Sequence, residues 1–260
     1  MAQKVAFGLG FVEVSVREAT PAETAAFAQD PTGEREAARE FVAYALSIGA
    51  IKFEPEYPDK WFQTKIGRHS PYFFNSGLFC SARDLYEVAQ AYLAVVEAHL
   101  TEEELPDVIY GPAYKGIQIA DGLAGALFDL NDYNPGVAFN RKEAKDHGEG
   151  GLLVGANMQG RRVLLVDDVI TSGKSKHEAL GFIRGAGGVP IGCVIAFDRQ
   201  EVGEDGTLSA AQEFTQMTGL PIYAAATLDD LIRELEEGPA VPGGAEALPH
   251  ILAYKDQYGV

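Results

Sequence analysis

An apolar run that ends in two adjacent carboxylates constrains this chain more than any other part of its sequence. Residues 163–175 have the sequence VLLVDDVITSGKS, in which Asp167 and Asp168 follow the apolar run and precede a small, hydroxyl-rich turn. The run has the length and β-branched content of a central parallel strand. Because open α/β sheets bind ligands at the carboxyl ends of such strands, the sequence predicts a binding site at this edge of a sheet.

The turn after the two acids has the composition of a phosphate site. Residues 171–175 offer backbone N–H groups and hydroxyls, and a helix expected to start near Lys176 adds the positive end of its dipole. Asp167 and Asp168 would repel a phosphate, so they suit ribose hydroxyls or a hydrated divalent cation instead. The pattern therefore indicates a sugar phosphate as the ligand.

Two other phosphate-binding motifs do not fit this chain. A nucleoside triphosphate loop needs a glycine five positions before Gly173, where the chain has Asp168. In the glycine cluster at residues 185–188 the third glycine of a dinucleotide motif is missing, because Val189 and Pro190 follow and a strand begins there. Both motifs are therefore excluded.

Residues 163–175 resemble the phosphoribosyl-pyrophosphate signature of type I phosphoribosyltransferases. Three further segments narrow the resemblance to the orotate phosphoribosyltransferases: GRHSPYFFNSGLF at 67–79, GPAYKGI at 111–117 and FNRKEAKDHGEGG at 139–151. The resemblance runs from about Arg39 to Val260. It implies an α/β fold of the type I phosphoribosyltransferase kind, with a central, mostly parallel sheet flanked by helices and a small hood subdomain built from N-terminal and C-terminal parts.

The resemblance also implies the domain limits and the activity. Residues 34–260 would form the domain, with the hood at roughly 34–80 plus C-terminal contributions and the core at roughly 81–235. Residues 1–33 would be an N-terminal extension, either a poorly ordered arm or a small added hairpin and helix. The implied reaction is Mg²⁺-dependent transfer of the phosphoribosyl group from 5-phosphoribosyl 1-pyrophosphate to orotate, giving orotidine 5′-monophosphate and pyrophosphate in de novo pyrimidine synthesis.

Two alternatives stay open at this point. One is a regulator that binds phosphoribosyl pyrophosphate without catalysis, and the other is the same transfer chemistry on another base.

The roles of individual residues follow from the motif match. The catalytic residues would be Lys145, Asp168, Lys115, Arg141 and His147. The residues binding phosphoribosyl pyrophosphate would be Tyr114, Lys115, Arg141, Lys142, Lys145, His147, Asp167, Asp168, Val169, Ile170, Thr171, Ser172, Gly173, Lys174 and Ser175. Those binding orotate would be Lys65, Phe73, Phe74, Thr171 and Arg199. Mg²⁺ would be held mainly by substrate oxygens and water, with Asp167 and Asp168 reaching it only through water.

The segment at residues 142–151 combines charge with glycine and has little apolar content. We expect it to be mobile when the site is empty and to close over a ligand. In the family that the chain resembles, this loop closes over the pyrophosphate in the neighbouring subunit's site. The resemblance therefore implies a homodimer with shared active sites.

The formal net charge of −17 excludes nucleic acid or an anionic membrane as the main partner, because both need a basic surface. No apolar stretch is long enough for a membrane span, and the N-terminus lacks a signal-type apolar segment. Cys80 and Cys193 have no metal-like spacing and are predicted to be reduced thiols. The expected location is the cytoplasm.

The order of the predicted elements is that of a βαβ series. Helices are expected at 34–48, 83–100, 115–129, 176–184, 208–217 and 228–237. Strands are expected at 107–110, 137–140, 163–166, 189–197 and 222–225, with a hairpin-like stretch at 52–75. Residues 238–244 are predicted to be a linker before a C-terminal segment at 248–258.

Overall fold

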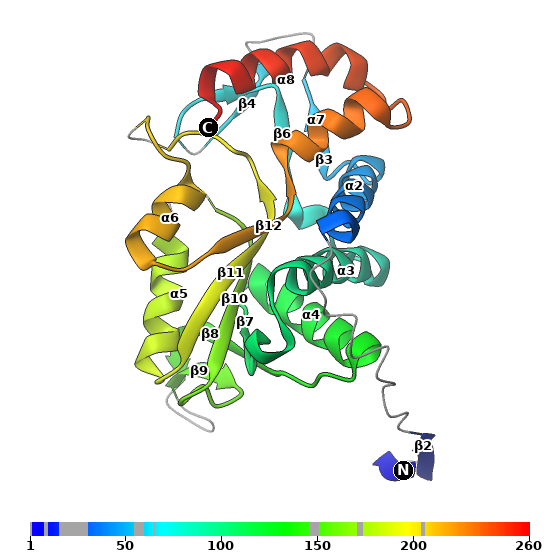
Figure 1. Cartoon of the computed structure of the whole chain (residues 1–260), viewed down its shortest axis with the longest axis vertical. Coiled ribbons are helices and arrows are strands. Elements are labelled where there is room, and N and C mark those ends of the chain that lie inside the picture. The colour runs from blue at the N-terminus through cyan, green and yellow to red at the C-terminus, as the bar shows by residue number, and fades with distance from the viewer. Residues whose placement is uncertain are drawn as a thin grey trace.

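The computed structural model describes residues 2–7, 10–15, 31–54, 60–64, 66–145, 151–170, 174–203 and 206–260 (Figure 1). Side chains are described within these ranges from residue 33 onward, apart from residues 144–145 and 174–175.

A six-stranded sheet forms the centre of the molecule, with strand order β12-β11-β10-β7-β8-β9. All neighbouring strands are parallel except β8 and β9, which pair antiparallel. The strands are β7 (Val108–Tyr110), β8 (Gly136–Lys145), β9 (Gly151–Gly155), β10 (Arg162–Val169), β11 (Val189–Asp198) and β12 (Ile222–Thr227). The order places β10 and β7 in the middle of the sheet, with β11 next to β10, so the carboxyl end of β10 is central to the structure.

Helices cover both faces of the sheet, with α5 and α6 on one side and α3 and α4 on the other (Figure 1). Their bounds are α3 (Ala82–His99), α4 (Lys115–Asn131), α5 (Lys174–Gly185) and α6 (Ala210–Thr218). Successive residues of β10 alternate between two apolar cores, since side chains of a strand point to opposite faces. Val163 and Leu165 pack with α5 and α6, whereas Leu164 and Val166 pack with α3 and α4. The same alternation applies to Asp167 and Asp168, whose side chains therefore point to opposite faces of the sheet.

Most of the remaining elements gather beyond the carboxyl ends of the central strands, near the top of Figure 1. Two small antiparallel sheets lie there, one of β3 (Ile51–Phe53) and β6 (Tyr72–Phe74), the other of β4 (Phe62–Gln63) and β5 (His69–Ser70). The helices are α2 (Pro31–Ser47), α7 (Leu228–Glu237) and α8 (Gly244–Tyr258), and a short 3₁₀ turn occupies Ser76–Leu78. A second 3₁₀ turn, Glu102–Glu104, lies between α3 and the amino end of β7. Sequence-distant segments therefore meet above one edge of the sheet.

Most predicted elements are confirmed, and the differences are local. The strand predicted at 137–140 continues to Lys145 and pairs with β9, so the ends of the segment predicted to be a mobile loop are β-structure. Residues 146–150 of that segment lie outside the described residues. Helix α5 begins at Lys174, and α8 begins at Gly244 within the predicted linker. In the N-terminal extension, β1 (Ala2–Phe7) and β2 (Gly10–Ser15) pair antiparallel.

Within the part of the chain that the structure describes, none of the helices combines the length and apolar character needed to cross a membrane.

Candidate active site

A cavity of about 310 Å³ opens at the carboxyl ends of β10 and β11, beneath the small sheets. We call it the central cavity. It is lined by Phe62, Gln63, Thr64, Ser70, Tyr72, Phe73, Phe74, Asn75, Ser76, Lys115, Asp167, Asp168, Val169, Ile170, Lys176 and Arg199. The edge of the sheet at which the sequence predicted a binding site is therefore hollow.

Asp168 lies between a lysine and a serine from two other elements. Its Oδ2 atom accepts hydrogen bonds from the Ser76 hydroxyl at 2.6 Å and from Lys115 Nζ at 3.0 Å, and Lys115 also donates to Ser76 Oγ at 2.6 Å. Burial raises the pKa of Asp168, but the bonds from Ser76 and Lys115 and the lysine charge outweigh it, so the pKa is lowered overall. Asp168 is thus an ionised acceptor at the cavity wall.

Asp167 points to the opposite face of β10 and binds a lysine of α5. Lys176 Nζ lies 2.5 Å from Asp167 Oδ2 and also donates to the carbonyl oxygen of Val169, and the Lys176 side chain is only 2% exposed. The Tyr92 hydroxyl donates to the backbone carbonyl of Asp167 at 2.7 Å. Burial raises the pKa of Asp167 although Lys176 opposes the shift. The two neighbouring acids therefore have different environments.

A tight loop between β7 and α4 brings Lys115 to Asp168. A Cβ atom at Gly111 would lie 1.9 Å from the carbonyl oxygen of Gly116, and one at Gly116 would lie 2.6 Å from Pro112 Cδ. Both positions need glycine because the backbone passes itself too closely for a side chain. The loop ends at Lys115, the first residue of α4, whose amino end consequently faces the cavity.

Two consecutive aromatic residues of β6 have different surroundings. Phe73 is 40% exposed and stacks on Phe62 with 5.4 Å between ring centroids, whereas Phe74 is 8% exposed and stacks on Phe197 at 5.2 Å. Both line the central cavity. Phe73 therefore presents an open aromatic face, while most of the Phe74 ring belongs to the apolar core.

Arg199 follows β11 and lines the central cavity together with Lys115. Its Nη2 atom donates to Ser70 Oγ at 2.8 Å and lies 2.5 Å from Glu201 Oε1, and its guanidinium carbon lies 4.2 Å from the centroid of the Tyr72 ring. Burial lowers the pKa of Arg199, but Tyr72 and Glu201 outweigh burial and raise it. The Arg199 guanidinium is therefore a permanent cation in the wall of the cavity, and these contacts do not use all five of its N–H donors.

Arg141 and Lys142 line a different cavity, of about 350 Å³, beside the loop at 111–114. Lys142 Nζ lies 4.7 Å above the centroid of the Tyr114 ring, and Arg141 Nη1 donates to the carbonyl oxygen of Gly151 at 3.2 Å. The structure thus separates these predicted pyrophosphate ligands from Lys115, which lies in the central cavity.

Several predicted site residues lie outside the described part of the chain. They are Lys65, His147, Thr171, Ser172 and Gly173, together with the side chains of Lys145, Lys174 and Ser175. The backbones of Lys174 and Ser175 form the first turn of α5 rather than the phosphate turn before it. Val169 and Ile170, which were predicted to bind phosphoribosyl pyrophosphate, line the central cavity.

Sequence reasoning gave no role in the site to four polar residues that lie in the wall of the cavity or directly behind it. Ser76 and Lys176 bind the two acids, and Ser70 and Glu201 bind Arg199. Ser70 and Ser76 lie in the segment at 67–79, so that segment could have pointed to them. Lys176 had a different signal, because a lysine two residues into a helix behind an acid pair is a candidate partner for one of the acids.

The residues at the cavity can accommodate a hydrated Mg²⁺ only with help from a ligand. Among the described residues, no group of three or more His, Cys, Asp or Glu side chains could hold a metal. Mg²⁺ in proteins commonly keeps several waters and takes one or two carboxylates plus substrate phosphates. Asp168, with its lowered pKa, provides a carboxylate of the required kind at the cavity.

Residues 88–206 match the model of the phosphoribosyl transferase domain family. The chain is 46% identical to an orotate phosphoribosyltransferase of Stenotrophomonas maltophilia (strain K279a) over 221 residues, 85% of this chain and 95% of the relative. It is 44% identical to one of Dichelobacter nodosus (strain VCS1703A) over 220 residues, covering 85% and 95% of the two chains.

A crystal structure of orotate phosphoribosyltransferase from Francisella tularensis superposes with a TM-score of 0.71 and 29% identity, covering 85% of this chain and all of that one. The family expected from the motifs and the fold expected from the strand pattern are both confirmed. The chain belongs to the orotate phosphoribosyltransferase family and has the type I phosphoribosyltransferase fold.

Proposed function

We propose that this protein transfers the phosphoribosyl group of 5-phosphoribosyl 1-pyrophosphate to orotate, using the central cavity as its active site. Family membership supports the activity and its place in pyrimidine synthesis. The observation that carries the assignment to this cavity is its lining, which combines an ionised acid paired with Lys115, the cation of Arg199 and the open face of Phe73.

The reaction needs positioning more than covalent chemistry. N1 of orotate displaces pyrophosphate at C1 of the ribose, while positive charge develops on the ribose and negative charge on the leaving group. Asp168 would accept hydrogen bonds from the ribose hydroxyls, because an ionised carboxylate has acceptor sites beyond those used by Ser76 and Lys115. Lys115 would move its ammonium group toward the pyrophosphate, since the lysine side chain is half exposed and flexible.

Phe73 and Arg199 would hold orotate in the same cavity. Phe73 would stack on the pyrimidine ring, and Arg199 would bind the carboxylate of the substrate by a charge-assisted hydrogen bond. Lys65, Phe74 and Thr171 complete the set that the family resemblance implies. A base without a carboxylate would leave the buried Arg199 charge without this partner, which favours orotate over a purine as substrate.

We propose Mg²⁺ as the metal that the reaction requires. When bound, it would neutralise charge on the pyrophosphate and ribose oxygens. Asp167 and Asp168 would contact it through water, and their negative charge would help to retain it at the cavity.

We also propose a symmetric homodimer with shared sites, in which Lys145 and His147 of one subunit serve the other. The position of Arg141 and Lys142 supports this arrangement, because these cations line a cavity separate from the one that holds Asp168 of the same chain. A cytoplasmic location fits the two free cysteines, of which Cys193 is buried with its pKa raised to about 12 by that burial.

A spectrophotometric assay tests the activity. We expect orotate to be consumed when phosphoribosyl pyrophosphate and Mg²⁺ are both present, and no consumption when a chelator removes the metal. Adenine and hypoxanthine serve as control bases. Transfer to either purine, with none to orotate, would overturn the proposal.

The Arg199→Gln variant tests the orotate wall. Loss of one charge-assisted contact costs about 1.5–3 kcal/mol, so the KM for orotate should rise about 10- to 100-fold. The KM for phosphoribosyl pyrophosphate should change by no more than about twofold, because the proposal assigns Arg199 to orotate and not to that substrate. Steady-state kinetics with each substrate varied in turn measures both values. An equal rise in the two KM values would instead indicate a general structural role for Arg199.

A further inference from the structure

The carboxylate of Glu201 joins several elements behind the wall of the central cavity. Its Oε1 atom binds Arg199 Nη2 at 2.5 Å and accepts from the Tyr72 hydroxyl at 3.3 Å, and its Oε2 atom accepts from the Tyr254 hydroxyl at 3.1 Å. The Glu201 side chain is 9% exposed. Donors from β6, from α8 and from the segment after β11 therefore fix both oxygens of one carboxylate.

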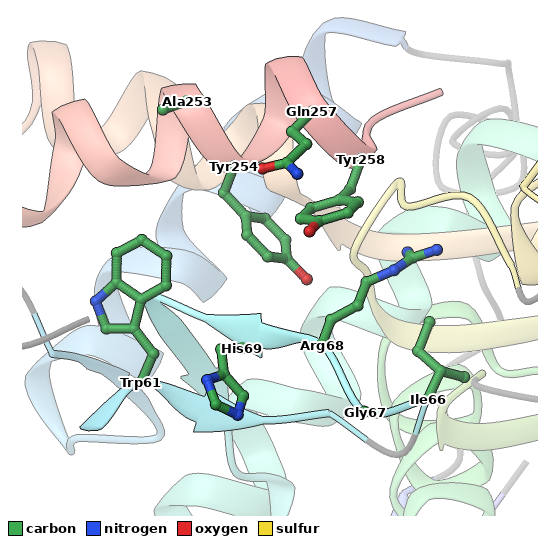
Figure 2. A pocket seen from close by; sticks show the side chains of 9 residues that line it. All are labelled: Trp61, Ile66, Gly67, Arg68, His69, Ala253, Tyr254, Gln257 and Tyr258. Atoms are coloured by element: carbon green, nitrogen blue, oxygen red, sulfur yellow. The ribbon is translucent and has the colours of Figure 1, made fainter. Parts of the chain in front are cut away.

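The C-terminal helix supplies the outermost part of this network. Figure 2 shows Tyr254 and Tyr258 projecting from α8 toward Arg68 and toward β5, which begins at His69. The ring centroids of Tyr254 and Tyr258 are 4.9 Å apart, and the Arg68 guanidinium lies 4.7 Å from the Tyr258 ring centroid. Helix α8 thus packs against the small sheets, and this packing places the Tyr254 hydroxyl within hydrogen-bonding distance of Glu201.

The segment that carries Glu201 is also held through its backbone. Arg68 donates to the carbonyl oxygens of Val202 at 2.7 Å and Gly203 at 3.1 Å. Glu201 itself forms a β-bridge with Gly259, just beyond the end of α8. The carboxylate is therefore held at a defined position relative to the cavity, and its place does not depend on a flexible loop.

We propose that Glu201 and Tyr254 are positioning residues that set the affinity of the site for the carboxylate of orotate. Glu201 binds one edge of the Arg199 guanidinium and so directs the remaining N–H donors into the central cavity, and Tyr254 holds Glu201 in place from α8. Neither residue needs to touch the substrate. This inference rests on the proposed role of Arg199 as the carboxylate ligand.

The arrangement must be distinguished from one in which Glu201 competes with the substrate. A glutamate that occupied the place of the orotate carboxylate would weaken binding, and its removal would lower the KM for orotate. A glutamate that positions Arg199 has the opposite effect. The two cases are separable because a guanidinium can bind two carboxylates through different edges.

The Glu201→Gln variant decides between the two cases. Glutamine keeps the shape and an oxygen acceptor but loses the charge, so we expect the KM for orotate to rise about tenfold while the KM for phosphoribosyl pyrophosphate stays within about twofold. Thermal unfolding is measured on the same samples. An unchanged or lowered KM for orotate, or an equal rise in both KM values, would overturn the proposal.

Two tyrosine variants keep the test decisive if Glu201→Gln folds poorly. Tyr254→Phe removes the hydroxyl that donates to Glu201 and should raise the KM for orotate about three- to tenfold. Tyr258→Phe is the matched control, because it removes the hydroxyl of the neighbouring ring on the same helix, and it should leave both KM values unchanged. Equal effects of the two variants would overturn the role of Tyr254.

A double variant separates this inference from the proposed function. If Glu201 acts through Arg199, adding Glu201→Gln to Arg199→Gln should produce no further rise in the KM for orotate. A full additional rise would mean that Glu201 acts independently and would overturn the inference. If Arg199→Gln alone leaves the KM for orotate unchanged, the proposed role of Arg199 fails instead.

Discussion

Replacing Lys176 by methionine should lower the free energy of unfolding by about 3–5 kcal/mol at neutral pH. Lys176 is almost completely buried and its ammonium group binds Asp167. The variant leaves a buried carboxylate without its cation, and the loss of one partner from such a pair costs more than the pair contributes to stability. Chemical denaturation followed by circular dichroism measures the change.

The pH dependence of this loss has a definite sign. Burial already raises the pKa of Asp167, and without Lys176 the pKa of the folded state should rise further above the value of about 3.9 in the unfolded chain. The folded variant then binds a proton that the unfolded variant releases. The stability of the variant relative to the parent should be highest at pH values below the pKa of Asp167 in the unfolded chain. It should fall as the pH increases through the pKa of Asp167 in the folded state.

Two further variants control for the removal of a lysine. Lys115→Met breaks the other ion pair of the cavity, but the Lys115 side chain is 53% exposed, so stability should fall by less than about 1 kcal/mol. Lys176→Met combined with Asp167→Asn removes both charges and should recover roughly half or more of the lost stability. Equal losses in the two lysine variants would contradict the argument from burial.

Lys145→Ala should reduce kcat by about 100-fold or more, because it removes a preorganised cation from the developing charge of the leaving group. The expectation depends on the proposed dimer, in which Lys145 serves the neighbouring subunit. Asp168→Asn should be similarly inactive for another reason, since the ribose loses its charged acceptor. Steady-state rates of the purified variants measure both losses.

Mixing the two inactive variants tests whether the sites are shared. Random exchange of subunits puts about half of the dimers in the mixed state. In a mixed dimer with shared sites, one site receives both defects and the other receives neither. Activity should therefore return to roughly a quarter of the parent value if the sites act independently. No recovery, with exchange confirmed by differently tagged subunits, would mean that Lys145 acts in its own chain.

The double variant Lys145→Ala, Asp168→Asn mixed with the parent chain provides the matched control. If sites are shared, every site of a mixed dimer contains one defect, so an equal mixture should retain roughly a quarter of the activity of the same total amount of parent protein. If each chain forms its own site, roughly half should remain. The two mixing experiments must therefore agree on one geometry.

The sequence by itself determined the fold class, the family and the edge of the sheet at which a ligand is expected to bind. Apolar runs of strand length alternate with helical patterns, and the run before Asp167 could be buried only within a sheet covered on both faces. The ends of such strands are local features, so Asp168 could be placed at the ligand-binding edge from the chain alone, and the family resemblance added Lys115. In the structure the central cavity opens at this edge, and both residues line it.

Only the tertiary structure decided which partners these residues have. Consecutive acids on β10 point to opposite faces of the sheet. Helix α4 packs so that Lys115 pairs with Asp168, and α5 packs so that the buried Lys176 pairs with Asp167. In the same way, Glu201 binds Tyr254 because α8 folds back over the small sheets, 53 positions further along the chain. Hydrogen bonds act over about 3 Å in space and leave no periodic signal in sequence, so the choice of Asp167 as the partner of Lys176 and of Tyr254 as a partner of Glu201 was decided only when the helices were in place.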